Sequence, residues 1–120
     1  MVVDMIKLSE AEEQKKIFEW AAYIPELKWL HCIPNGGSRN IREAVNLKRQ
    51  GVKKGIADMF LPIPKGKYHG LYIELKVGKN KLSVYQKEFL EYVNKVGYLG
   101  MVCYGHEEAI KCITEYLKIG

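Results

Sequence analysis

The sequence predicts an α/β fold in which helices flank a central mixed β-sheet, with the element order αβαββαβα. Three observations support this fold class. Helical periodicity alternates with short apolar, strand-like runs, capping residues and glycines mark the segment boundaries, and no repeat or low-complexity stretch interrupts them. A chain of 120 residues has the length of one domain, so residues 1–120 are expected to form a single unit.

The first segments are a helix and a short strand. Ser9 and Glu12 have the spacing of a capping box, and apolar residues then recur at helical intervals until Pro25. An apolar run over residues 27–33 leads into a Pro-Asn-Gly-Gly sequence, which is typical of a strand that enters a loop.

A second helix is expected over residues 41–50. Its polar side is basic, and Gly51 is placed to end it. We expect the apolar residues of this helix to face the protein interior. They are Ile41, Ala44, Val45 and Leu47.

The middle of the chain predicts an antiparallel pair of strands. Residues 57–63 and 71–77 have the length and the apolar content of strands. The connection between them, residues 64–70, contains proline and glycine and is of hairpin size.

The last third predicts a helix, a strand and a helix. Ser83 is expected to cap the first helix, and Gly97 to end it. Residues 98–104 are almost all apolar, which is typical of a strand buried on both faces, and residues 106–117 have helical spacing. The expected apolar stripe of the first helix is Tyr85, Phe89, Tyr92, Val93 and Val96.

Composition excludes several classes of protein. Hydrophobic residues make up 48% of the chain, and no apolar run approaches the roughly 20 residues of a membrane span, so no membrane partner is expected. The N-terminus lacks the apolar core of a secretory signal, and the three cysteines contain no CxxC pair. These features favour a cytoplasmic protein with reduced thiols.

The positive charge is concentrated in the middle of the chain. The sequence carries 19 Lys and Arg against 14 Asp and Glu, a formal charge of +5. Residues 31–81 alone hold eleven basic and three acidic residues, which gives +8. Such a segment favours a polyanionic partner, nucleic acid first, because each neutralised phosphate releases condensed counterions. The alternative is a solvated, lysine-rich surface.

Three charged residues on two neighbouring strands are the candidates for chemistry. Glu74 and Lys76 point to one face of their strand, because side chains alternate, and Leu75 points to the other. If Asp58 lies across from Glu74, two carboxylates meet in a site for a hard cation such as Mg²⁺. Lys76 would then stand beside a phosphate or an attacking water. The alternative is an exposed ion pair between Glu74 and Lys76.

Asp58 followed by Glu74, Leu75 and Lys76 resembles the PD-(D/E)XK nuclease signature, and the wider sequence resembles its VRR-NUC branch. The resemblance covers residues 9 to about 117, and Ala57 stands where the family usually has proline. The stretches that carry it are residues 9–14, 33–37, 51–58, 68–76, 82–86 and 97–98.

This resemblance implies a restriction-endonuclease-like core and a Mg²⁺- or Mn²⁺-dependent endodeoxyribonuclease. It implies that Asp58, Glu74 and the backbone carbonyl of Leu75 hold the metal ion, and that Lys76 is the catalytic lysine. It also implies a supporting glutamate in the first helix and a glutamine after the E-x-K strand, which Gln86 matches. Gln86 also fits the capping box of its own helix, and the two roles are compatible.

Helix geometry ranks the candidates for the supporting glutamate. At about 100° per residue, Glu10 lies about 20° from Ile17 and Glu13 about 40° away on the other side. Glu12 lies on the far side and is explained by the capping box. Glu10 is therefore the first candidate and Glu13 the second. For Glu10, a favourable interaction with the helix dipole is the alternative.

Basic residues after a glycine-rich loop are the candidates for DNA contact. They could follow phosphates on either side of the metal, and none has a base-reading pattern, so we expect recognition of DNA shape rather than sequence. The candidates are Arg39, Arg42, Lys48, Arg49, Lys53 and Lys54.

Cys103 and His106 have the spacing of half a zinc site. No second pair of ligands stands elsewhere in the chain at a matching spacing, so zinc is not expected. Cys103 is more simply explained as a small core residue.

Together these features predict a structure-selective DNA endonuclease. Small stand-alone members of the family are typical of phages and resemble Holliday junction resolvases that act as homodimers, which implies a four-way DNA junction as the substrate, in the host-cell cytoplasm. The alternatives are a nuclease for flap, nicked or single-stranded DNA, and a non-catalytic DNA-binding module. A protein-interaction domain would require that DNA affinity be absent at low salt.

Overall fold

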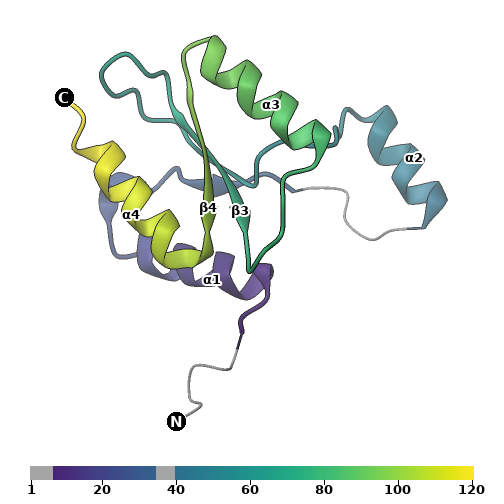
Figure 1. Cartoon of the computed structure of the whole chain (residues 1–120), viewed down its shortest axis with the longest axis horizontal. Coiled ribbons are helices and arrows are strands. Elements are labelled where there is room, and N and C mark those ends of the chain that lie inside the picture. The colour runs from purple at the N-terminus through teal and green to yellow at the C-terminus, as the bar shows by residue number, and fades with distance from the viewer. Residues whose placement is uncertain (1–6, 35–39) are drawn as a thin grey trace.

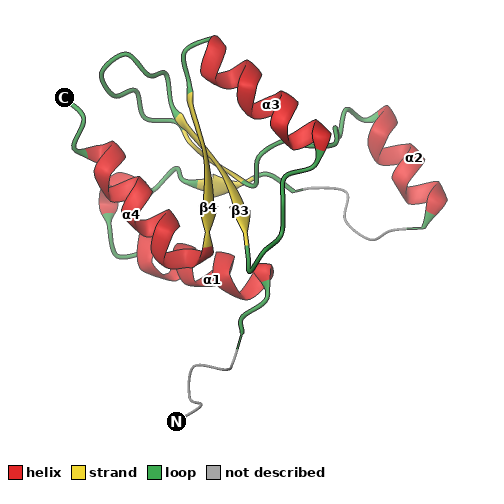
Figure 2. Cartoon of the chain, viewed as in Figure 1, coloured by secondary structure: helices red, strands yellow, loops and turns green. Residues whose placement is uncertain are grey.

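A mixed sheet forms the centre of the protein in a computed structural model that describes residues 7–34 and 40–120. Within these residues it has four strands, which lie side by side in the order in which they follow along the chain. Figure 2 shows the strands between the helices. β1 (His31–Cys32) pairs antiparallel with β2 (Met59–Leu61), and β2 pairs antiparallel with β3 (Leu71–Lys76). β3 pairs parallel with β4 (Leu99–Tyr104), which lies at the edge. The predicted mixed sheet and its central antiparallel pair are confirmed.

The same residues form four α-helices, three of which pack against this sheet. α1 (Glu10–Ala21) and α4 (Gly105–Leu117) lie against one face, and α3 (Val84–Lys95) lies on the other face beside β4 (Figure 1). α2 (Ile41–Arg49) stands apart from the sheet (Figure 1). The order of elements is the one predicted. None of the helices described here is long and apolar enough to cross a membrane.

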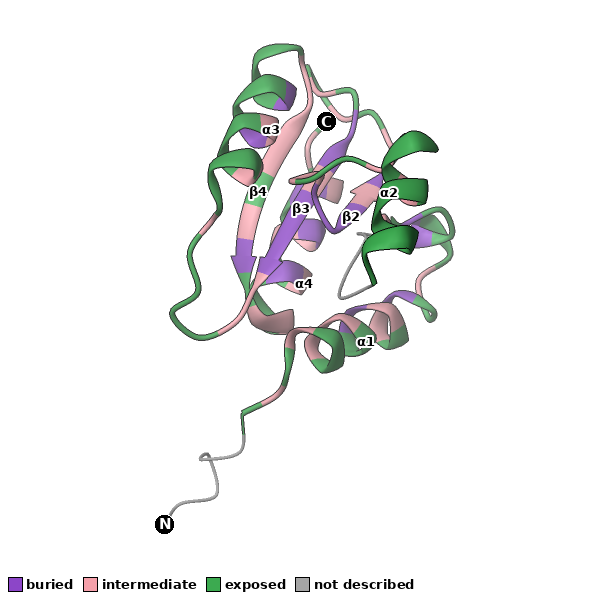
Figure 3. Cartoon of the chain, turned by 90° about the vertical axis from the view of Figure 1, so that its right-hand side faces the viewer, coloured by how far each residue is buried: buried purple, intermediate pink, exposed green. Residues whose placement is uncertain are grey.

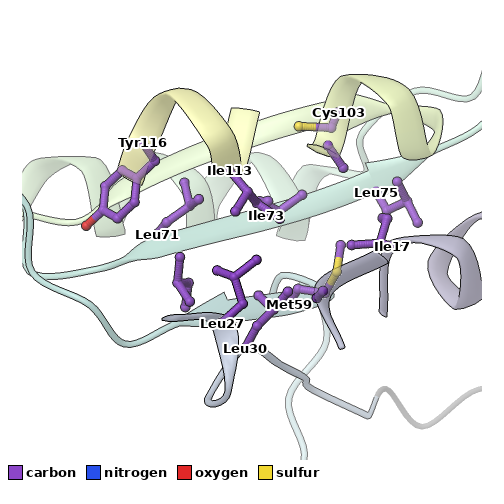
Figure 4. Close-up of a cluster of buried hydrophobic side chains, with 13 residues drawn as sticks. Ile17, Leu27, Leu30, Met59, Leu71, Ile73, Leu75, Cys103, Ile113 and Tyr116 are labelled. Carbon is purple, nitrogen blue, oxygen red and sulfur yellow. The ribbon is translucent and has the colours of Figure 1, made fainter. Parts of the chain in front are cut away.

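The main core lies between the sheet and the layer of α1 and α4. Leu71, Ile73 and Leu75 of β3 point into it at intervals of two residues (Figure 4). Residues 72, 74 and 76 therefore point to the opposite face, on which α3 lies. The other buried members of this core are Ile17, Ala21, Leu27, Leu30, Met59, Leu61, Cys103, Ala109, Ile113 and Tyr116.

α3 is anchored to the opposite face by close packing at its middle. Its buried residues are Leu90 and Val93, and a Cβ added to Gly100 of β4 would lie 2.9 Å from Val93 Cγ2. The ring of Phe89 packs against Tyr72, with 5.2 Å between the ring centroids. This packing fixes where the first turn of α3 lies relative to β3.

The apolar side of α2 does not face the interior, which corrects the expectation for this helix. Ile41 is 83% exposed and Val45 50%, Ala44 is exposed, and Leu47 alone within α2 is partly covered (Figure 3). Helical spacing predicts which residues share a side but not what that side contacts. Gly51, at φ +100°, follows the helix end as predicted.

The strand predicted over residues 27–33 is wrong for most of its length. Pro25 has the fixed φ that suits a first helical turn, and it begins a 3₁₀ helix, η2 (Pro25–Leu27). Leu27 and Leu30 still enter the core, but from the turn rather than from a strand. β1 is left with two residues.

Two expectations about burial near the C-terminus also need correction. β4 is not buried on both faces, because it is an edge strand, and Cys103 is its one buried residue. In α3, Tyr85, Tyr92 and Val96 are exposed rather than part of an inward stripe. The helix meets the sheet along Leu90 and Val93 instead, because Gly100 offers a gap without a side chain.

Candidate active site

Two carboxylates lie side by side where β2 and β3 meet. Asp58 directly precedes β2, and the pairing of Met59 with Ile73 puts it in register with Glu74. Asp58 is 8% exposed and Glu74 2%. The backbone N–H of Leu75 donates to Asp58 Oδ2 at 2.7 Å, which fixes the Asp58 carboxylate against β3. The sequence-based expectation that Asp58 lies across from Glu74 therefore describes the geometry.

The two carboxylate oxygens of Glu74 have different surroundings. Oε2 accepts a hydrogen bond from Gln86 Nε2 at 3.0 Å and lies 3.8 Å from Lys76 Nζ. Oε1 is buried and has no hydrogen-bond partner in the described part of the chain. Burial and the negative charge of the adjacent Asp58 carboxylate raise the pKa of Glu74 to about 8, and Lys76 opposes the shift. A buried acceptor without a donor is costly, so this position favours a cation.

α1 presents Glu10 to the two carboxylates. Burial and the charge of Asp58 raise the pKa of Glu10, and the charge of Lys76 opposes the rise. Glu10 therefore lies within electrostatic reach of both residues, as its angle on the helix predicts. Glu12 instead closes the capping box with Ser9, as expected.

Glu13 serves α4 rather than the carboxylate site. Its Oε2 accepts a hydrogen bond from the backbone N–H of His106 at 2.7 Å and also pairs with His106 Nδ1. Burial raises the pKa of Glu13, but the bonds and charge from His106 hold it below its ordinary value. Tyr104 gives α4 no side-chain cap, so Glu13 supplies an acceptor at the start of that helix.

The first turn of α3 delivers Gln86 to the site. Ser83 Oγ accepts from the Gln86 N–H at 3.1 Å, and Gln86 Oε1 accepts from the Ser83 N–H at 2.8 Å. Gln86 Nε2 is left to donate to Glu74, so one side chain both caps α3 and reaches the site. Gly55, at φ +84°, lets the chain before β2 approach this turn, because a Cβ there would lie 2.5 Å from the Tyr85 carbonyl carbon.

The oxygen donors at this position fit one hard divalent cation. Asp58 and Glu74 supply carboxylate oxygens, and the Leu75 carbonyl points to the same neighbouring strand as the Leu75 N–H. No three His, Cys, Asp or Glu side chains among the described residues form a complete metal site. A cation here would therefore complete its ligand shell with the Leu75 carbonyl, water and phosphate, as Mg²⁺ commonly does.

The predicted DNA-contacting residues do not gather around the carboxylates. Those that the structure describes are exposed on α2 and on the loop after it: Arg42, Lys48, Arg49, Lys53 and Lys54. Arg39 lies outside the described residues. Lys54 reaches the turn that carries Gln86, with its Nζ 5.6 Å from the centre of the Tyr85 ring.

Cys103 and His106, which have the spacing of half a zinc site, each interact with another residue. His106 is paired with Glu13, and the Cys103 thiol interacts with that of Cys112. The link between Glu13 and His106 was not expected from the sequence. The spacing of Glu10 and Glu13 could have indicated it. The two glutamates are three residues apart on the side of α1 that faces the protein, so each of them requires a partner from a neighbouring element.

A mixed β-sheet flanked by helices thus carries the buried carboxylates of Asp58 and Glu74 beside the Lys76 ammonium group. The family model of the VRR-NUC domain, a nuclease-type domain, matches residues 2–107, and the chain belongs to this family. A solved structure described as a VRR_NUC domain protein is 33% identical, with a TM-score of 0.83 over 96% of this chain and 93% of that chain. No curated protein matches the chain. The predicted family and fold class are thus confirmed.

Proposed function

We propose that the protein is a Mg²⁺- or Mn²⁺-dependent DNA endonuclease that resolves four-way junctions as a homodimer. One observation carries the metal-dependent chemistry. Glu74 Oε1 is buried beside Asp58 and has no hydrogen-bond partner among the residues described. A carboxylate held in this way gains little as part of the fold alone but is well placed to bind a cation.

Asp58, Glu74 and the backbone carbonyl of Leu75 would hold the cation. When bound, it would supply Lewis-acid stabilisation of the negative charge that develops on the phosphate. Lys76 keeps its ammonium next to Glu74, where it would orient the attacking water and stabilise the same charge. Gln86 holds Glu74 Oε2 in place, and Glu10 is the supporting carboxylate from α1.

Charge and symmetry support the choice of substrate. Residues 31–81 carry a net charge of +8, and the basic residues of α2 and the following loop are exposed, which supports a polyanionic partner. A four-way junction requires two paired cuts, and a C₂ dimer supplies two equivalent active sites. The homodimer and the junction are the parts of the proposal that follow from the family resemblance.

The experiment is cleavage of a labelled four-way junction, compared with matched linear duplex, flap and single strand, in Mg²⁺ or Mn²⁺. We expect paired symmetric cuts in the junction, their loss in Lys76→Ala, and normal activity in Lys118→Ala, an exposed lysine at the end of α4. Preferential cutting of flap or single strand would keep the nuclease chemistry and refute the junction.

A second variant separates an enzyme from a DNA-binding module. Asp58→Asn keeps the size of the side chain and removes the charge, so it should bind DNA as the parent does and cleave nothing. If the parent binds the junction but cuts no DNA in either metal, the non-catalytic module is the better description. If DNA does not bind even at about 50 mM salt, where phosphate contacts are strong, the protein is not a nuclease of this kind.

A further inference from the structure

The first turn of α3 exposes an aromatic ring beside the candidate active site. Tyr85 is 54% exposed, although it directly precedes Gln86, whose side chain points inward to Glu74. Its neighbour Val84 is 78% exposed. Neither Tyr85 nor Val84 has a part in the mechanism given above.

The loop before β2 holds this ring at the edge of the site. Gly55 packs against the Tyr85 backbone so closely that an added Cβ would lie 2.5 Å from the carbonyl carbon. Lys54 Nζ lies 5.6 Å from the centre of the Tyr85 ring, within the range of a cation–π interaction. Asp58 follows Lys54 on the same loop, and Gln86, which contacts Glu74, directly follows Tyr85, so the two segments that hold the ring and the ammonium group both lead to the carboxylates.

An exposed tyrosine ring with an ammonium group beside it has the chemistry to bind one nucleotide. Aromatic rings stack on nucleobases with little regard to sequence, and a lysine neutralises a neighbouring phosphate. We propose that Tyr85 and Lys54 form a subsite for an unpaired nucleotide next to the phosphodiester that is cut. This subsite rests on the proposed nuclease function, because that function places DNA at the carboxylates.

The nucleotide must be unpaired for a geometric reason. A base inside a duplex is stacked on both faces, and a side-chain ring reaches one of them only after the base has been unstacked. A base at a flap or at an opened branch point has a face available. The local charge also fits: of the three acidic residues in 31–81, Asp58 and Glu74 are buried in the site, so the exposed surface of this segment is strongly basic.

Two substitutions of Tyr85 and one matched control test the subsite. Tyr85→Leu keeps an apolar side chain and removes the ring, whereas Tyr85→Phe keeps the ring. Tyr92→Leu is the control, because Tyr92 is 61% exposed on the same helix but lies about two turns away. All three are made in the Lys76→Ala background, so that the DNA stays uncut, and circular dichroism checks that each variant is folded.

The probes are a flap DNA with 2-aminopurine at its first unpaired position and a continuous duplex with the same base paired inside. Binding is measured by anisotropy, and stacking by quenching of the 2-aminopurine fluorescence. We expect Tyr85→Leu to bind the flap about tenfold more weakly and to lose the quenching, with duplex affinity unchanged. Tyr85→Phe and Tyr92→Leu should behave as the parent.

Equal flap affinity for Tyr85→Leu and the parent would overturn the subsite, and so would the same loss on flap and duplex. The second result would mean that Tyr85 only supports Lys54 in a general phosphate contact. Quenching that depends on Tyr85 in a protein whose wild type cuts no DNA would refute the nuclease function and keep only the stacking of Tyr85 on an unpaired base. Cleavage by the wild type, with no effect of Tyr85→Leu on flap binding, would refute the subsite and keep the nuclease function. A protein that binds neither probe would refute both proposals.

Discussion

The buried carboxyl of Glu74 makes the metal-free protein less stable as the pH rises. Its pKa is about 8 in the folded protein against an ordinary value of 4.5, so the folded state keeps a proton that the unfolded chain releases between these values. Each pKa unit corresponds to about 1.4 kcal/mol, so the free energy of unfolding at pH 7 is lowered by roughly 3 kcal/mol. Glu74→Gln keeps an acceptor for Gln86 and carries no charge, so it should remove this penalty.

Thermal unfolding in EDTA between about pH 5 and pH 8, followed by circular dichroism, measures the effect. The wild-type Tm should fall across this range, while that of Glu74→Gln stays level. At pH 7 the variant should unfold roughly 10 °C higher, because about 1 kcal/mol shifts Tm by about 4 °C in a chain of this size. Glu91→Gln removes an exposed carboxylate from α3 and should keep the wild-type slope.

Parallel loss of stability in wild type and Glu74→Gln would refute the reasoning, because Glu74 would then not be the group that titrates. Magnesium provides an independent check on the same two proteins. A cation that binds the folded wild type raises its Tm at pH 8 by mass action, by about 2.7 kcal/mol of unfolding free energy at a hundred times Kd. The Tm of Glu74→Gln should not respond to the same concentration.

Three further substitutions test the packing of the fold. Gly55→Ala should lower the free energy of unfolding in urea by about 2 kcal/mol or more, because φ is +84° and the new Cβ would lie 2.5 Å from the Tyr85 backbone; an unchanged midpoint would show that the loop can move away. Glu13→Gln should cost roughly 1–2 kcal/mol at pH 7 through its weakened bonds to His106. Because the pKa of Glu13 is lowered in the folded protein, the stability difference between wild type and Glu13→Gln should reach its full size at pH values above the ordinary pKa of glutamate. The difference should disappear as the pH falls through the pKa of Glu13 in the folded protein, and a difference that persists in acid would contradict this prediction. Ile41→Ser should change the free energy of unfolding by less than about 0.5 kcal/mol, because the side chain is 83% exposed. A larger loss would mean that α2 packs against the rest of the protein.

The centre of the site could be predicted because it depends on short-range geometry. Glu74 and Lys76 share a face in any strand, and the antiparallel pairing of two adjacent strands brings Asp58 opposite Glu74. Glu10 follows from its angle to Ile17, which is fully buried and so fixes which side of α1 faces the sheet. Each of these inferences needed only the periodicity of a strand or helix and one residue whose orientation was known.

The parts that could not be predicted depend on which surfaces meet. The apolar residues of α2 share a side, but Ile41 and Val45 are left exposed because the helix stands apart from the sheet. The apolar residues of β4 predict a strand that is buried on both faces, yet the strand lies at the edge of the sheet and most of its residues are partly exposed. His106 is far from Glu13 in sequence, and only the packing of α4 against α1 brings them together.

The first turn of α3 connects the two halves of the proposed site. Consecutive helical residues point about 100° apart, so Gln86 can reach inward to Glu74 while Tyr85 stays at the surface beside Lys54. The backbone of this same turn is held by Gly55, on the loop that leads to Asp58. A shift of the turn would therefore move both the Gln86 side chain that orients Glu74 and the Tyr85 ring that is proposed to stack on the nucleotide. Gly55→Ala should accordingly weaken flap binding and metal-dependent cleavage at once, whereas Tyr85→Leu should weaken flap binding and leave the Mg²⁺-induced rise in Tm unchanged.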